Sequence, residues 1–123
     1  MADRSTTGRP IVRRLAETAG TPCPCGTAYR IVRGEDGAPA SVHIVEIRVD
    51  SERHYHRTLT EIYTCIEGQG TLELDDEVVA LEPGVVVVIP PGVRHRARPG
   101  SGGALRVVNT VIPPFNADDE WVD

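Results

Sequence analysis

The sequence has few cysteines, no excess of positive charge and no long apolar run. It contains three cysteines, an odd number, and nothing in it marks the chain for secretion, so a disulfide framework is not expected. The formal net charge of -5 gives no support for a nucleic-acid partner, and no apolar run approaches the length of a membrane span. The stretch MADRSTTGRP has no apolar segment of the signal-peptide type, and we therefore expect a cytoplasmic location.

Two of the cysteines, Cys23 and Cys25, stand one residue apart in the segment TPCPCGT. A thiol pair can bind a soft metal ion, but no second Cys or His pair follows at the spacing of a zinc finger. Pro24 also stiffens the turn between the two thiols. We interpret the segment as a loop rather than a metal or redox site.

The sequence is rich in turn-forming and β-branched residues. Val and Ile are prominent in the 40% hydrophobic fraction, and 12 glycines and 10 prolines interrupt the chain often. About eight strands with no long helix are expected, a pattern typical of an all-β sandwich or barrel. The expected strands occupy residues 28–34, 40–50 and 61–67, a hairpin over 71–81 that turns at Asp75–Asp76, a fully apolar run at 85–90 that suits a buried strand, a short strand within 91–100, and 104–114.

The length of 123 residues fits a single domain. We divide the chain into an N-terminal arm (residues 1–27), a β-barrel (28–114) and a C-terminal acidic tail (115–123). No internal repeat or linker interrupts the barrel.

The segment HYHRTLTEIYTCIEG carries three candidate metal ligands. In a strand, residues i and i+2 point to the same face, so His54 and His56 can reach one ion. If a strand begins at Glu61, that carboxylate shares a face with Tyr63 and Cys65. Two imidazoles and one carboxylate suit iron(II), manganese, nickel or zinc.

A fourth candidate, His95, lies between Arg94 and Arg96. If its ring points inward, both arginines point outward. Mixed histidine and carboxylate ligation is typical of a catalytic site with open positions and not of a structural zinc site. The alternative is that these are ordinary surface residues, but three of the four histidines fall into the pattern.

The same residues resemble the two motifs of the cupin superfamily. The first motif, G(X)5HXH(X)3,4E(X)6G, is matched by His54, His56, Glu61 and Gly68, and the second, G(X)5PXG(X)2H(X)3N, by Gly84, Pro90, Gly92 and His95. Arg48 and Pro99 stand where the motifs have Gly and Asn. The chain resembles a small bacterial single-domain cupin of the cupin 2 type.

This resemblance implies a jelly-roll β-barrel (a double-stranded β-helix) with one divalent metal ion per chain near its centre. The implied ligands are His54, His56, Glu61 and His95, and the ion is Fe, Mn, Ni or Zn. Cupins of this size are often homodimers, so we also expect a homodimer.

Three further residues are candidates for the pocket. Tyr63 and Cys65 share the face of Glu61 and should both line the cavity. Tyr63 can bind substrate or transfer a proton, or it can simply fill space. Cys65 is interpreted as a small buried hydrophobic residue. His43 is either a core or rim histidine or a proton shuttle, and we keep it with Tyr63 as a candidate catalytic residue.

Two kinds of function remain open. The first is a metal-dependent enzyme on a small molecule, of the dioxygenase type or of the isomerase, cyclase or elimination type. The second is a non-catalytic, metal-dependent domain that binds or senses a small molecule or sugar. The sequence does not choose the substrate, the reaction or the metal.

Overall fold

The computed structural model describes residues 9–123, which form short β-strands and three single-turn 3-10 helices. The strands are β1 (Gly20–Cys23), β2 (Gly26–Val32), β3 (Ser41–Ile47), β4 (Thr60–Glu67), β5 (Gly70–Leu74), β6 (Glu77–Leu81), β7 (Val86–Ile89), β8 (His95–Pro99) and β9 (Leu105–Ile112). The 3-10 helices are η1 (Leu15–Glu17), η2 (Gly34–Asp36) and η3 (Ala117–Asp119). Within the described residues, no helix has the length and apolar character needed to cross a membrane. The predicted all-β class is confirmed.

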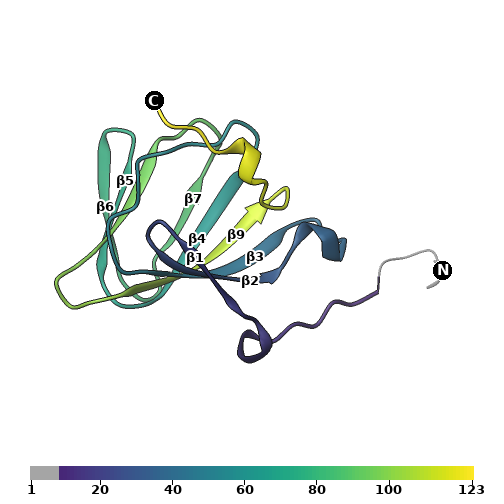
Figure 1. The fold of residues 1–123 in the computed structure, drawn as a ribbon. Helices are drawn as coiled ribbons and strands as arrows, with labels where there is room; N and C mark the ends of the chain where they lie inside the picture. The colour runs from purple at the N-terminus through teal and green to yellow at the C-terminus, as the bar shows by residue number, and fades with distance from the viewer. Residues whose placement is uncertain (1–8) are drawn as a thin grey trace.

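The strands form two antiparallel sheets that enclose a barrel (Figure 1). Six strands lie in the order β1-β2-β3-β9-β4-β7, and three lie in the order β6-β5-β8. Strand β9 is inserted between β3 and β4, so the last strand of the chain joins two segments that are separated in sequence. This non-sequential order is the jelly-roll arrangement implied by the sequence motifs.

The hydrophobic core lies between the two sheets. Ile47, Leu105 and Val107 contribute from the larger sheet, and Leu72 and Ala97 contribute from the smaller one. Each of these side chains is at most 3% exposed. Burial of this apolar area stabilises the barrel and provides a rigid frame for the polar side chains near one end of the core.

Strand β4 shows the predicted alternation. Glu61, Tyr63 and Cys65 are buried, whereas the residues between them are partly exposed. Cys65 packs in the apolar core and does not line the cavity described below, so the prediction that it faces the cavity is wrong. Two residues further along a strand lie about 7 Å away, which takes Cys65 from the cavity into the core.

The apolar run at 85–90 is not fully buried, in contrast to the prediction. Strand β7 is the outermost strand at one edge of the six-stranded sheet. Val86 and Val88 are each 58% exposed, while Ile89 faces the interior. An apolar composition alone does not distinguish a strand covered on two faces from a strand covered on one.

The segment expected to be an N-terminal arm supplies a strand to the sheet. Strand β1 pairs with β2, with Gly20 opposite Tyr29 and Cys23 opposite Gly26, so the barrel begins before residue 28. Strand β1 lies at the edge of the sheet, where a proline such as Pro22 is tolerated. Residues 1–8 of the predicted arm lie outside the described residues.

Two turns of the chain contain residues with positive φ angles, one within the smaller sheet and one between the sheets. Asp75 has a φ of 52° and forms the turn between β5 and β6, as expected for the Asp75–Asp76 hairpin. Gly68 has a φ of 81° where β4 leads into β5, and a Cβ atom there would lie 2.3 Å from the carbonyl oxygen of Ala104. Only glycine fits this position, which explains its place in the first motif.

Candidate metal centre

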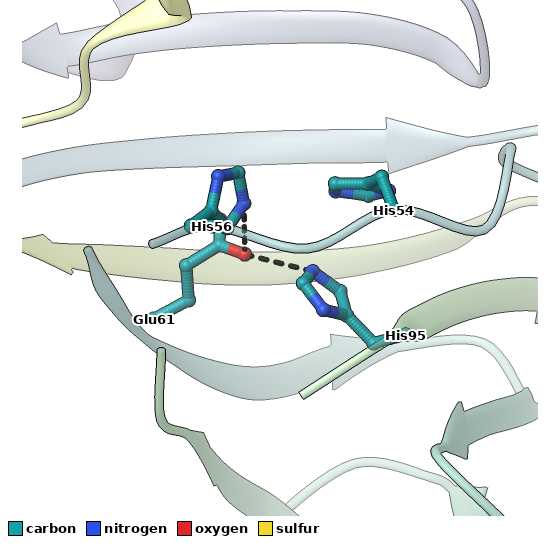
Figure 2. Close-up of side chains that lie close together, drawn as sticks. All are labelled: His54, His56, Glu61 and His95. Atoms are coloured by element: carbon teal, nitrogen blue, oxygen red, sulfur yellow. Dashed lines mark hydrogen bonds and ion pairs between the residues drawn. The ribbon is translucent and has the colours of Figure 1, made fainter. Parts of the chain in front are cut away.

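Four side chains from separate parts of the chain point toward one another inside the barrel (Figure 2). His54 and His56 precede β4, Glu61 lies in β4, and His95 begins β8. Their ligand atoms all lie within 4.8 Å of one another. His56, Glu61 and His95 are each at most 3% exposed, and the side chain of His54 is 15% exposed. The structure therefore brings together all four predicted ligands.

Backbone hydrogen bonds hold the two histidine-bearing segments together. The amide of His54 donates to the carbonyl of His95 at 3.1 Å, and the amide of His95 donates to the carbonyl of His54 at 2.8 Å. The amide of Gly92 donates to the carbonyl of His56 at 2.7 Å. His54 forms an isolated β-bridge with His95, and His56 lies two residues further along, outside any regular strand. Both rings nevertheless point into the same cluster, as their i, i+2 spacing predicts.

Each imidazole has its Nδ1 atom facing a backbone carbonyl. The distances are 2.7 Å from His54 to Glu52, 2.6 Å from His56 to Asp119, and 2.9 Å from His95 to Val93. A carbonyl oxygen only accepts, so Nδ1 carries the hydrogen in all three rings. In the neutral ring the lone pair is then on Nε2. Such bonds fix the tautomer and the orientation of metal-binding histidines.

Glu61 occupies the centre of the cluster. Its Oε1 atom lies 3.0 Å from Nε2 of His56 and 2.9 Å from Nε2 of His95. Its Oε2 atom accepts a hydrogen bond from Nδ2 of Asn109 at 2.6 Å. Two neutral rings would direct lone pairs toward the same carboxylate oxygen, so the arrangement requires positive charge between them. That charge comes either from protons or from a shared cation.

The electrostatics of the cluster favour a cation. Burial opposes ionisation of Glu61, but the hydrogen bonds with His56 and His95 outweigh it and hold the pKa of Glu61 well below its usual range. Burial lowers the pKa of His56, while its bond to Glu61 raises it, with a net rise. Burial and the neighbouring His95 lower the pKa of His54. An ionised carboxylate with three oriented imidazoles fits a divalent metal ion, and these four residues could hold one.

A cavity of about 280 Å³ opens beside the cluster. Its floor is a row of paired residues across neighbouring strands of the larger sheet. Tyr63 on β4 is opposite Asn109 on β9, Asn109 is opposite His43 on β3, and His43 is opposite Arg30 on β2. All four line the cavity, as do Glu61 and His54. The row places groups that donate or accept protons next to the predicted ligands.

Both candidate catalytic residues, Tyr63 and His43, line this cavity. Burial raises the pKa of Tyr63 well above its usual value, and the charge of Glu61 adds to this rise. Burial and the positive charge of Arg30 lower the pKa of His43 to about 4. Nε2 of His43 lies 2.9 Å from Oγ of Ser41. Near neutral pH, the phenol therefore keeps its proton and the imidazole is uncharged.

The family model described as "Cupin domain" matches residues 30–111, which is most of the chain. The chain belongs to the cupin family. The expected fold and the resemblance in the two motifs are thereby confirmed. Over 76 residues, this cupin is 30% identical to the protein MJ1618 of Methanocaldococcus jannaschii, and it spans 61% of the length of that relative.

Solved structures show the same fold over almost the whole chain. A protein from Planctomyces limnophilus is 34% identical with a TM-score of 0.82, and the match covers 96% of this cupin and 99% of that chain. Ectoine synthase from P. lautus is 21% identical with a TM-score of 0.78, covering 91% and 88% of the two chains. The nucleoside dehydratase Pac13 of Streptomyces is 21% identical with a TM-score of 0.77, covering 92% and 90%. The last two similarities concern the fold alone.

Asp119, in the C-terminal tail of this cupin, supports the centre and was missed by the sequence analysis. Its carbonyl oxygen accepts the hydrogen bond from His56, 63 positions away. Its carboxylate accepts from the amides of Arg57, Thr58 and Leu59, from the hydroxyl of Thr58 and from the indole of Trp121, at 2.6–3.2 Å. The bond from Thr58 contributes most to holding the pKa of Asp119 below its usual range. No spacing or motif marks this residue.

Cys23 and Cys25 also line the cavity, at the turn between β1 and β2. Their Sγ atoms lie 3.3 Å apart. Burial and the contact with Cys23 raise the pKa of Cys25 to about 12, so this thiol is not an activated nucleophile near neutral pH. Within residues 9–123, the histidine and glutamate cluster is the only group of three or more side chains placed to bind one metal ion.

The arginines that flank His95 do not enter the cavity. Arg94 is paired with Asp123 at 2.9 Å, and Arg96 is paired with Glu73 at 2.7 Å. These pairs agree with the expectation that arginines on either side of an inward-facing histidine point outward. The pair of Arg94 with Asp123 also links the residue that precedes β8 to the C-terminal tail.

Proposed function

We propose that this cupin is a metal-dependent enzyme that acts on a small polar molecule. The observation that carries this proposal is the convergence of His54, His56, Glu61 and His95 beside a 280 Å³ cavity. Four protein ligands leave one or two positions free in a five- or six-coordinate ion. A buried site with open positions and an adjoining cavity is better suited to chemistry than to structural metal binding.

The donor set supports a divalent ion of the borderline or hard type. Three imidazoles and one carboxylate suit iron(II) or manganese slightly better than zinc, and nickel also fits. When bound, the ion would polarise an oxygen atom of the substrate as a Lewis acid. Thiolates are absent from the ligand set, which argues against a preference for copper(I).

The residues around the cavity favour isomerisation, cyclisation or elimination over dioxygenation. Each of those reactions moves protons. The row on the cavity floor contains one group that can donate a proton and one that can accept a proton. Tyr63, which retains its proton, is the proposed donor, and His43, which is uncharged, is the proposed acceptor. Asn109 lies between them and orients Glu61. Pac13 is a nucleoside dehydratase with the same fold, which supports the proposal that this fold can carry out such a reaction.

The test is turnover by protein loaded separately with iron(II), manganese, nickel or zinc. We expect non-redox conversion of at least one member of a panel of hydroxy acids, oxo acids, nucleosides and uronates, followed by NMR without oxygen uptake. The variant His56→Ala should lose turnover and metal together, while Tyr63→Phe should lose turnover and retain metal. Oxygen consumption with catechols, thiols or diketones would instead assign a dioxygenase. Tight ligand binding with no turnover under any metal would assign a binding or sensing domain.

We also propose that a second copy of the chain covers the outer face of the larger sheet. Val86 and Val88 on β7 are exposed, as is Ile112 at the end of β9. Exposed apolar residues gathered on one sheet face are typical of interfaces. A homodimer is expected by analytical ultracentrifugation, and Val86→Glu combined with Val88→Glu should shift it to monomer. A wild-type protein that sediments as a monomer at micromolar concentration would contradict this proposal.

A further inference from the structure

Arg30 is the basic side chain of the cavity and lacks an acidic partner there. It lies on β2 at the end of the polar row that is farther from Glu61. Among residues 9–123, no carboxylate forms an ion pair with it, and its guanidinium makes no hydrogen bond to any of these residues. Its contact is with the ring of Phe115, 4.6 Å from the ring centroid. Its five donors are therefore free to bind a ligand.

Many other arginines of the chain pair with a carboxylate, and the described ones that do not, Arg9, Arg53 and Arg57, lie outside the cavity. Arg13, Arg48, Arg94 and Arg96 each pair with a carboxylate within 3 Å, and all four lie outside the cavity. In a chain with 13 basic and 18 acidic residues, acidic partners are common. An arginine that lines a cavity and has none is more consistent with a binding role than with a structural one.

The charges of the cavity are separated along its length. Glu52 and Glu120 line it near His54, with the carboxylate of Glu120 3.5 Å from Nε2 of that histidine. Glu61 lies within the ligand cluster, and Arg30 lies on the opposite side of His43. His43 is uncharged near neutral pH, so Arg30 is the positively charged group at its end of the cavity. The guanidinium and the acidic side chains therefore lie toward opposite ends of the cavity.

The spacing of the strands sets the scale of such a ligand. Arg30 and Asn109 are separated by β3, so their Cα atoms are about 10 Å apart at the usual spacing of neighbouring strands. Both side chains project into the same cavity, which shortens the gap between the guanidinium and the ligand cluster. A short molecule can contact both.

We propose that Arg30 anchors a carboxylate of the substrate while the other end of the molecule, an oxo or hydroxy acid group, faces His54, His56, Glu61 and His95. The substrate class is then a short oxo or hydroxy dicarboxylate. A carboxylate is chosen because its two oxygens match the paired N–H donors of a guanidinium. This assignment rests on the proposed function, because it places the reacting end of the substrate at the metal site.

The test measures binding and not turnover. Zinc-loaded protein is titrated calorimetrically with 2-oxoglutarate and 2-oxoadipate, and with their methyl-ended counterparts 2-oxopentanoate and 2-oxohexanoate. Each pair shares a chelating end and differs at the distal end. We expect at least one dicarboxylate to bind about 10-fold or more tightly than its counterpart, as is typical of a charge-assisted pair. Arg30→Gln should abolish this preference, and Arg30→Lys should retain part of it.

Controls separate this inference from the proposed function. Arg14→Gln, which changes an exposed arginine outside the cavity, should bind all four compounds like the wild type. Zinc stoichiometry is measured for every variant and reports on folding of the centre. If zinc binds but neither dicarboxylate is preferred, or if the preference survives Arg30→Gln, the anchoring role is wrong and the metal site stands. If wild-type protein binds no metal, the proposed function fails and this inference fails with it.

Discussion

The two ends of the cavity differ in how completely their polar groups are partnered. At the ligand end, the Nδ1 atom of every histidine faces a backbone carbonyl, and both oxygens of Glu61 have contacts. At the other end, Arg30 contacts an aromatic ring and makes no polar bond to residues 9–123. The protein thus orients one set of groups in advance and leaves another for a ligand. Preorganisation is valuable where an ion must be bound in one geometry, and free donors are valuable where a substrate must be recognised.

The largest expected effect comes from breaking the ligand end. His95→Ala removes the Nε2 atom that could bind the metal ion and leaves Glu61 with one fewer contact. Metal affinity should fall by more than the roughly 10–100-fold that is typical for loss of an outer hydrogen-bond partner. Elemental analysis after dialysis measures the metal that each protein retains. Val93→Ala, which keeps the backbone carbonyl bonded to His95, is the control and should retain the metal.

The next effect concerns the C-terminal tail, which supports the ligand end from outside. Asp119→Ala removes the acceptor for three backbone amides and releases the carbonyl that orients His56. The metal affinity of this variant should fall about 10–100-fold, the usual result of losing an outer hydrogen-bond partner. The metal affinity of Asp119→Asn should fall less, because asparagine keeps one acceptor oxygen. Competition with a chromophoric chelator gives the affinities. The neighbouring exposed residue provides a matched control, Asp118→Asn, and equal losses in both variants would contradict a specific role for Asp119.

A third effect is on stability. An ion that binds only the folded state stabilises it by about 2.7 kcal/mol at 100 times its Kd, which for a domain of this size raises Tm by about 10 °C. Chelation should therefore lower Tm in wild-type protein by a comparable amount in differential scanning calorimetry. His56→Ala, which lacks a ligand, should not respond to added metal. An unchanged melting curve after verified metal removal would show that the cluster is held by the protein alone.

The smallest effect concerns pH at the other end of the cavity. Burial and Arg30 lower the pKa of His43 to about 4, whereas the unfolded value is near 6.5. The unfolded chain therefore binds a proton first as pH falls below about 6.5, and folding stability decreases until the folded pKa is reached. The loss attributable to His43 between pH 8 and pH 5.5 is about 1 kcal/mol. In metal-free protein, His43→Gln should show a correspondingly flatter dependence of urea unfolding on pH, and identical slopes would contradict this assignment.

The sequence was informative wherever the relevant geometry is local. The i, i+2 spacing of His54 and His56 predicted that both rings reach one ion, and the two motifs placed Glu61 and His95 beside them as candidate ligands. Alternation also placed Tyr63 on the face of Glu61. The same rule did not show that Cys65 lies in the core. Whether an inward-facing residue meets the cavity or the apolar core depends on which side chains of the other sheet pack against it.

The composition, the turns and the two motifs by themselves determined the all-β class, the cupin family and the four residues that could hold a metal ion. Only the tertiary structure decided that the tail folds back to His56, that β7 lies at an edge with Val86 and Val88 exposed, and that Arg30 shares a cavity with the cluster. The physical reason is that strand order and the docking of a terminus depend on contacts between distant residues, which no local periodicity encodes.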